Sequence, residues 1–125
     1  MAPWSRAELD TIGGAEEIEV APRRGDGSLR DPVTIWVVRG GDGIYVRSAV
    51  KGRYAAWYRS AEETHEGRLS AGSMAKDVGF VDADPALNDE IDAAYRSKYR
   101  RYAGRILDSC LTPEARSTTL RIDPR

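Results

Sequence analysis

The clearest fold signal in the chain is the segment VTIWVVR (residues 33–39), followed by GGDG (residues 40–43) and IYVRSAV (residues 44–50). Its first part is rich in β-branched and aromatic residues, which fit the pleated surface of a strand. The glycines and the aspartate are typical of a hairpin turn, so the last part is predicted to be the return strand. Strand side chains alternate between two faces, which places Ile44, Val46 and Ser48 on one face and Tyr45, Arg47 and Ala49 on the other.

Upstream of this hairpin the sequence predicts one helix and one strand. Ser5 and Glu8 have the spacing of a capping box, and Gly13 and Gly14 end the helix that follows. Trp4 precedes the cap and is placed for a hydrophobic staple with an apolar residue of the helix. Polar and apolar residues then alternate over residues 17–21, which indicates a strand.

Downstream of the hairpin, helical and extended patterns alternate. Strands therefore come in hairpin runs, which predicts a mainly antiparallel sheet and the α+β class. About six strands in one short chain favour a small β-barrel with flanking helices, formed by a single domain over residues 1–125. The remaining predicted elements are a helix at 54–61, a polar loop at 62–67, a weaker hairpin at 68–72 and 75–81, a long helix from Pro85 to about Tyr102, a short helix from Pro113 and a strand at 118–122.

Composition excludes several classes of protein. The chain has 125 residues, of which 41% are hydrophobic and 31% charged, as expected of a globular domain. Its 19 basic and 20 acidic residues nearly cancel, which argues against a nucleic-acid partner. No apolar run approaches the ~20 residues of a membrane span. One cysteine and one histidine exclude an intrachain disulfide and a multi-histidine metal site, so we expect a cytoplasmic protein with no bound metal.

The loop RRGDGS (residues 23–28), together with Arg30, is the first candidate site. Arg23 and Arg24 offer adjacent guanidinium groups, the glycines let backbone amides turn inward, and Ser28 adds a hydroxyl. This combination suits a phosphate or a carboxylate. The alternative is a solvated hairpin loop in which the arginines provide solubility.

A second candidate site combines the return strand, the break after it and the next helix. Aromatic rings supply a flat apolar wall, and a basic side chain holds an anionic tail. In the alternative interpretation Trp57 belongs to the core and Arg47 is a surface residue of the strand. The residues of this site are Tyr45, Arg47, Ser48, Lys51, Trp57 and Tyr58.

The other reactive side chains favour structural roles. The acidic run at residues 62–66, with the one histidine, is predicted to be a solvated face rather than a metal site. Cys110 is expected to be a buried small side chain. Tyr95, Tyr99 and Tyr102 recur at helical spacing, which is typical of core or of a dimer interface. No nucleophile and base stand together, so the sequence assigns no catalytic residue.

Five segments together extend over nearly the whole chain: PVTIWVV (32–38), GDGIYVRS (41–48), AWYR (56–59), FVDADPALN (80–88) and TLRI (119–122). In these segments the sequence resembles an uncharacterised bacterial family of short proteins. The central part also resembles, more distantly, the flavin- and deazaflavin-binding split β-barrel reductases. Those proteins have a basic loop with serine and glycine, an apolar strand, a glycine turn, a return strand and a Trp-Tyr pair on a helix.

The reductase resemblance implies a split β-barrel, a homodimer and a cofactor, FMN or a deazaflavin, at the dimer interface. It places Arg23, Arg24 and Ser28 where the cofactor phosphates are held in that family. One departure is Asp26, whose negative charge stands where a phosphate is expected and repels it unless paired. The resemblance also puts Trp36, Arg47, Ser48, Lys51 and Gly52 along the isoalloxazine ring or its tail.

Three functional hypotheses follow. In the first, the chain is a flavin- or deazaflavin-dependent oxidoreductase acting on a small organic molecule, with the ring doing the redox chemistry. In the second, it is a cofactor-free small-molecule binding protein, or an isomerase or cyclase, that uses the same pocket. The third is a purely structural or interaction role, with exposed aromatic residues forming a flat patch.

Overall fold

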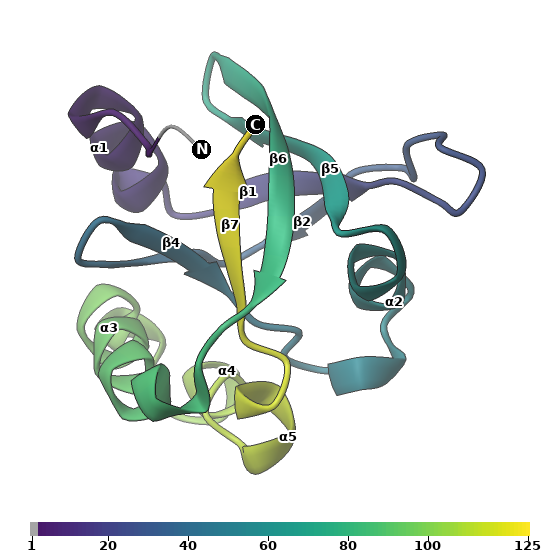
Figure 1. Ribbon diagram of the computed structural model, residues 1–125. Helices are drawn as coiled ribbons and strands as arrows, with labels where there is room; N and C mark the ends of the chain where they lie inside the picture. Colours follow the sequence, from purple (N-terminus) through teal and green to yellow (C-terminus); the bar gives the residue numbers. More distant parts are fainter. Residues whose placement is uncertain (1–2) are drawn as a thin grey trace.

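The computed structural model describes residues 3–125, which form one curled antiparallel sheet with flanking helices (Figure 1). The strand order is β2-β1-β5-β6-β7-β4-β3, and all six neighbouring pairs are antiparallel. The predicted α+β class and barrel-like sheet are therefore confirmed. The strands are β1 Ile18–Pro22, β2 Val33–Ile35, β3 Val38–Gly40, β4 Gly43–Val46, β5 Glu66–Ala71, β6 Met74–Asp82 and β7 Leu120–Pro124.

The strand predicted at residues 33–39 is broken at Trp36 and Val37 into β2 and β3. The first half pairs with β1, and the second half pairs with β4. Because β1 and β4 are far apart in the strand order, one straight strand cannot pair with both, and the chain bends between the halves. The two edges of the sheet are thus joined by two residues, which curls it toward a barrel.

The hairpin β5–β6, expected to be weak, is the longest pairing in the sheet and runs from Glu66 opposite Gly79 to Ala71 opposite Met74. The polar loop predicted at residues 62–67 is wrong. Residues 62–64 complete a helix, and β5 begins directly after His65, whose φ of 58° makes the left-handed turn between them. A polar helix end and a strand that starts with a glutamate and a glycine look alike in sequence, because neither carries an apolar pattern.

Helix α1 begins as its capping box predicts. The Ser5 hydroxyl accepts a hydrogen bond from the Glu8 backbone N–H at 3.1 Å, and the Glu8 carboxylate accepts one from the Ser5 N–H at 2.9 Å. Trp4 and Leu9 are buried in the same core cluster. The helices are α1 Arg6–Gly14, η1 Gly52–Tyr54, α2 Ala56–Thr64, η2 Pro85–Leu87, α3 Asn88–Lys98, η3 Arg100–Tyr102, α4 Arg105–Asp108 and α5 Pro113–Arg116.

The long helix predicted from Pro85 is three consecutive helical pieces, η2, α3 and η3. Asp84 caps the first of them by accepting a hydrogen bond from the Ala86 N–H at 2.9 Å. The chain leaves α-helical geometry at Tyr99. The short helix α4 was not predicted, because four residues are too few to show a period.

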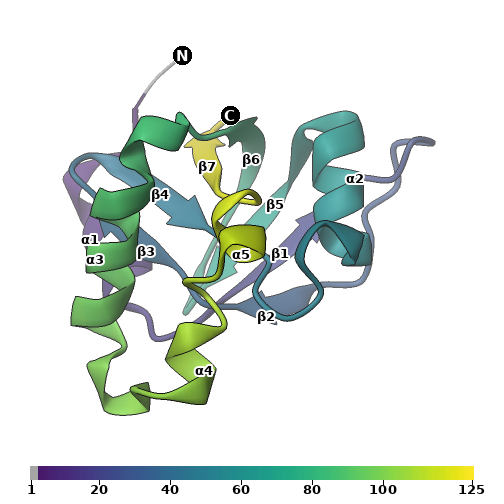
Figure 2. The ribbon, with the colours of Figure 1, turned by 90° about the horizontal axis from the view of Figure 1, so that it is seen from below.

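Two apolar clusters pack on the two faces of β4. Ile44 and Val46 belong to the cluster inside the curled sheet, which α1 and α2 cover. Tyr45 faces the second cluster, with Tyr95 of α3. The predicted alternation along β4 is therefore confirmed. Figure 2 shows α3, α4 and α5 gathered along one end of the sheet, which is where the second cluster lies.

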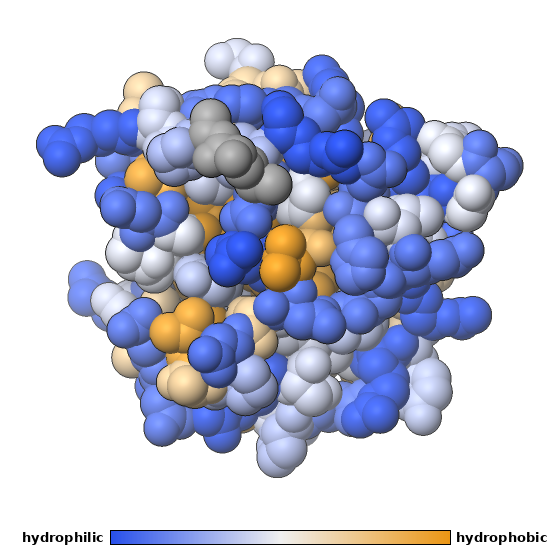
Figure 3. Space-filling view, viewed as in Figure 1, coloured by the Kyte–Doolittle hydropathy of each residue, from blue (hydrophilic) through white to orange (hydrophobic). Residues whose placement is uncertain are grey.

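The face of the molecule in Figure 3 is mostly hydrophilic, with small separate hydrophobic areas. Large apolar side chains that are more than half exposed are Val50, Tyr54 and Ile106. Among residues 3–125, no helix is both long and apolar enough to cross a membrane.

Candidate functional site

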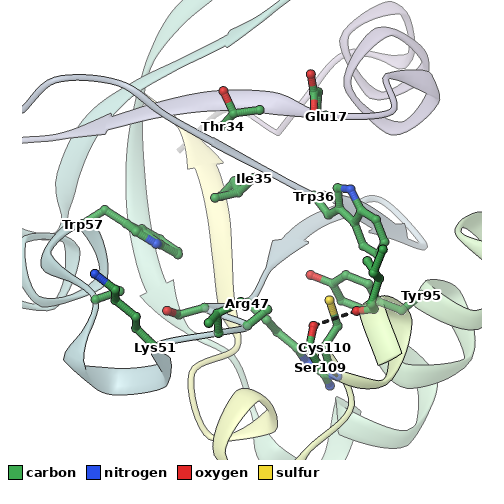
Figure 4. A pocket seen from close by; sticks show the side chains of 15 residues that line it. Glu17, Thr34, Ile35, Trp36, Arg47, Lys51, Trp57, Tyr95, Ser109 and Cys110 are labelled. Carbon is green, nitrogen blue, oxygen red and sulfur yellow. Dashed lines mark hydrogen bonds between the residues drawn. The ribbon is translucent and has the colours of Figure 1, made fainter. Parts of the chain in front are cut away.

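A cavity of about 450 Å³ lies between β2, the segment after β4, the start of α2 and helix α4 (Figure 4). This volume is in the range of small-molecule sites. Five residues predicted for a site line it: Trp36, Arg47, Ser48, Lys51 and Trp57. The other lining residues are Glu17, Thr34, Ile35, Ala49, Val50, Ala55, Tyr95, Ile106, Ser109 and Cys110.

The two indole rings form opposite walls of this cavity (Figure 4). Trp36 stacks on Tyr99, with ring centroids 3.9 Å apart and planes 2° from parallel. The Tyr99 hydroxyl accepts a hydrogen bond from the Val37 N–H at 3.0 Å and donates to the Glu16 carbonyl at 2.6 Å. Burial raises the pKa of Tyr99 to about 12, so its hydroxyl stays protonated. The Trp36 wall is therefore held in place from behind.

Trp57 is only 8% exposed and packs in the core cluster while one side lines the cavity. Both interpretations of this residue are thus partly right. Its neighbour Tyr58 meets it edge-on, with centroids 6.1 Å apart, and lines a different, polar cavity of about 610 Å³. The structure therefore separates two residues that the sequence placed in one pocket.

Arg47 lines the cavity, but its guanidinium turns away and is used inside the protein (Figure 4). Nε donates to Thr119 Oγ1 at 2.9 Å, Nη1 to Asp92 Oδ1 at 2.5 Å and to the Cys110 carbonyl at 2.9 Å. Nη2 donates to the Asn88 carbonyl and side-chain oxygen, both at 3.2 Å. A guanidinium has five N–H groups, and all five have acceptors. Arg47 is 3% exposed, so the alternative interpretation of it as a surface residue is wrong. Its hydrogen bonds connect β4 to α3 and to the segments that contain Cys110 and Thr119.

Lys51 adds a second basic side chain to the cavity lining. Its side chain reaches toward Trp57 in Figure 4, and it makes no ion pair within residues 3–125. Glu17, likewise without an ion pair in that range, lies beyond Ile35 at the other end of the cavity. The cavity is thus apolar in its walls and carries a positive and a negative side chain at opposite ends.

Ser48 and Gly52 flank Lys51 in different ways. Ser48 is buried, and its backbone N–H donates to Thr118 Oγ1 at 2.9 Å, which fixes the segment after β4. Gly52 is buried behind the cavity wall, with a φ of +54° that disfavours any other residue. Its place in the resemblance, along the cofactor tail, stays a prediction.

The arginine loop does not line this cavity. It projects beyond α2 (Figure 1) and is folded on itself. Arg23 Nη1 donates to the Gly27 carbonyl at 2.8 Å, and Arg24 Nη1 donates to the Leu29 carbonyl at 2.8 Å. Arg30 reaches Ser60 Oγ at 3.4 Å instead. The assignment of Arg23, Arg24, Ser28 and Arg30 to a cofactor stays a prediction.

Asp26 occupies the centre of this loop. Its carboxylate accepts hydrogen bonds from the Ser28 N–H at 2.9 Å and the Ser28 hydroxyl at 2.7 Å. These two bonds, with the nearby charge of Arg24, lower the pKa of Asp26. The loop therefore supplies its own anion at the position where the resemblance expects a phosphate.

A pair of carboxyl groups lies away from the cavity, at the end of α2. Burial and the neighbouring Asp82 carboxylate raise the pKa of Glu62 to about 7. Burial also raises the pKa of Tyr58, which lies beside Glu62, to about 12. In the described part of the chain, no group of three or more His, Cys, Asp and Glu side chains is arranged to hold a metal ion.

Sequence reasoning missed the part of the cavity that α4 supplies. Ile106, Ser109 and Cys110 belong to α4 or follow it, and nothing in the local pattern marks that helix. Cys110 is buried as expected, and burial raises the pKa of its thiol. Val50 could have been predicted from sequence, because a valine next to Lys51, where a strand ends, is not expected to be buried. The structure leaves Val50 88% exposed.

Three solved structures share the fold at low sequence identity. A heme storage protein, HutZ, from Vibrio cholerae has a TM-score of 0.67 at 14% identity, with 96% of this chain and 89% of that chain covered. An F420 reductase has a TM-score of 0.59 at 16% identity, with 98% and 96% covered. A pyridoxamine 5′-phosphate oxidase-related, FMN-binding protein from Nostoc punctiforme has a TM-score of 0.51 at 14% identity, with 99% and 81% covered.

These likenesses confirm the predicted split-barrel architecture. No curated protein is similar enough in sequence to be matched to this chain. A family model, in contrast, matches residues 8–122, which is nearly the whole chain. The chain therefore belongs to DUF2255, a family of uncharacterized proteins conserved in bacteria.

Proposed function

We propose that the cavity binds the planar ring of a flavin or deazaflavin, and that the chain is an oxidoreductase acting on a small organic molecule. The observation that carries this proposal is the pair of indole walls, Trp36 and Trp57, on opposite sides of a cavity of about 450 Å³. Support also comes from structural neighbours whose names refer to F420 and FMN.

In this proposal the ring supplies hydride or electron transfer when bound, and the protein supplies position and electrostatics. Trp36, backed by Tyr99, and Trp57 orient the ring. Lys51 balances the anionic part of the ligand. Val50 and Ile106 at the rim limit access of water to the ring.

The side chains of the cavity favour a flavin-type ring over heme. The one histidine of the chain, His65, lies outside the cavity, with Nδ1 3.0 Å from the Phe80 carbonyl oxygen. The other side chains that ligate heme iron are a thiolate, a phenolate and the methionine thioether, and Met74 does not line the cavity. Burial raises the pKa of both Cys110 and Tyr95, which opposes either anion.

The homodimer is part of the proposal. Val50 is 88% and Ile106 is 60% exposed, and both lie at the cavity rim. Covering such apolar groups with a second copy of the chain removes them from water and closes the site. Light scattering on a sizing column should give twice the chain mass of 13.8 kDa. Ile106→Glu should lower the measured mass toward that of a single chain.

The binding experiment titrates the protein with FMN and with the deazaflavin F420, following tryptophan quenching and the ligand's absorption. We expect saturable binding of at least one, weakened by Lys51→Gln. Lys76→Gln is the matched control, because Lys76 is paired with Glu8 at 2.7 Å away from the cavity. If neither ligand binds, the cofactor proposal is rejected. Oxidation of the reduced ligand by small organic acceptors then tests the activity.

A second candidate function, binding of a small molecule without a cofactor, is favoured by one observation. Both donors of Ser28 bond to Asp26, and Arg23 Nη1 and Arg24 Nη1 each donate to a backbone carbonyl of the same loop. Under this alternative, Asp26→Ser leaves flavin affinity unchanged. A clear gain in affinity supports the first proposal instead, because it shows that a phosphate enters the loop once the carboxylate is gone.

A further inference from the structure

A carboxylate of the protein itself is bound at the turn that follows the segment after β4. This basic turn is formed by Lys51, Gly52 and Arg53. The carboxylate of Glu114, on α5, accepts hydrogen bonds from the Arg53 backbone N–H and from Arg53 Nε, both at 3.3 Å. It packs so closely on Gly52 that a Cβ atom there would lie 2.5 Å from Glu114 Oε1. The carboxylate therefore packs directly against the backbone at Gly52.

The contact has the chemistry of an anion site but is weakly held. Hydrogen bonds from Arg53 lower the pKa of Glu114, and the pairing raises the pKa of Arg53. The side chains of Arg53 and Glu114 are 61% and 44% exposed, and both hydrogen bonds are slightly longer than is usual for N–H···O. Ion pairs of this exposed kind contribute little to stability. A stronger anion is therefore able to displace the carboxylate.

The basic turn is also next to the cavity. Lys51 lines the cavity, and Arg53 is two residues further, at most about 7 Å along the chain. Every N–H of Arg47 has an acceptor within the protein, so its charge does not serve an anion in the cavity. An anionic tail that leaves the cavity beside Lys51 meets the Arg53 donors next.

We propose that the Arg53 donors, beside Lys51, form an anion subsite for the phosphate of the ligand bound in the cavity, and that the Glu114 carboxylate occupies this subsite until the phosphate displaces it. The inference rests on the proposed flavin- or deazaflavin-binding function of the cavity. Glu114 then favours ligands whose anionic group can displace its carboxylate. A dianionic phosphate competes with it for Lys51 and Arg53, whereas a neutral ribityl chain does not, so the site discriminates between ligands that share the same ring.

The test compares FMN with riboflavin, which has the same ring without the phosphate, on wild type and three variants. We expect Glu114→Gln to raise FMN affinity about two- to fivefold and to leave riboflavin affinity unchanged, because only the phosphate meets the subsite. Arg53→Gln should lower FMN affinity by a similar factor, again without effect on riboflavin. Glu19→Gln, at an exposed position of β1, is the matched control for loss of one negative charge.

A second measurement uses inorganic phosphate in place of a flavin. Inorganic phosphate should raise the melting temperature of Glu114→Gln more than that of wild type, since ligand binding to the folded state stabilises it. An unchanged ratio of FMN to riboflavin affinity in Glu114→Gln overturns the subsite while the proposed function stands. If neither FMN nor riboflavin binds, flavin is rejected as the cofactor. The phosphate measurement then decides whether the basic turn is an anion site, and an equal shift in both proteins rejects it.

Discussion

Replacing Arg47 by methionine tests whether this buried guanidinium is structural. The change keeps an unbranched apolar side chain of similar length and removes all five hydrogen-bond donors. Asp92, whose side chain is only 10% exposed, then loses its 2.5 Å partner. The Thr119 hydroxyl and the Cys110 carbonyl lose theirs as well.

The magnitude follows from the contacts. Breaking a buried ion pair by removing one partner costs about 3–5 kcal/mol. Asp92 keeps a second cation, since Arg116 Nε lies 3.5 Å from Oδ2, so we expect the lower end, about 3 kcal/mol. A domain of this size has a total stability of about 5–15 kcal/mol. The loss is therefore a large share of the free energy of unfolding.

Urea unfolding followed by tryptophan fluorescence measures this loss. With a slope of about 1.5–2 kcal/mol per molar urea, a loss of about 3 kcal/mol lowers the midpoint by about 1.5–2 M. Arg39→Met is the matched control, because Arg39 pairs with Asp10 at 3.1 Å with side chains 36% and 66% exposed. That control should change the free energy of unfolding by less than about 1 kcal/mol. A loss below about 1 kcal/mol for Arg47→Met refutes the structural role.

Three further predictions follow. The pKa of Glu62 in the folded chain is about 7, above its ordinary 4.5. Between these two pH values the folded chain therefore binds more protons than the unfolded chain, so stability should fall as pH rises from about 4.5 to 7. Glu62→Gln should flatten that slope in urea unfolding at a series of pH values, and an unchanged slope contradicts the raised pKa. Gly52→Ala should lower stability by about 1–3 kcal/mol, because the residue has a φ of +54° and the new Cβ meets Glu114; a melting temperature equal to wild type argues against that geometry. The Cys110 thiol is buried with a raised pKa, so a thiol reagent should label it only on unfolding, and rapid labelling of the native chain means that the cavity exposes it.

Local patterns were enough to predict much of the fold. The capping box at Ser5 and the proline after Asp84 mark helix starts, because the groups that satisfy a free helix end are adjacent in sequence. The alternation along β4 placed Arg47 with Tyr45, on the face away from Ile44, because successive strand side chains point to opposite faces. A separate prediction grouped the break after the return strand with the next helix, and Lys51 and Trp57 do line the same cavity.

Local patterns in the sequence located most strands and helices and showed which β4 side chains share a face, since those properties depend on neighbours a few residues apart. The break at Trp36 and Val37 came from long-range pairing instead, because the two halves of the predicted strand pair with β1 and β4, which are distant in the sheet. Only the tertiary structure gave Arg47 acceptors at Asn88, Asp92 and Thr119, between 41 and 72 residues away. A residue's charge is visible in sequence, but whether that charge faces a ligand depends on acceptors that folding brings to it.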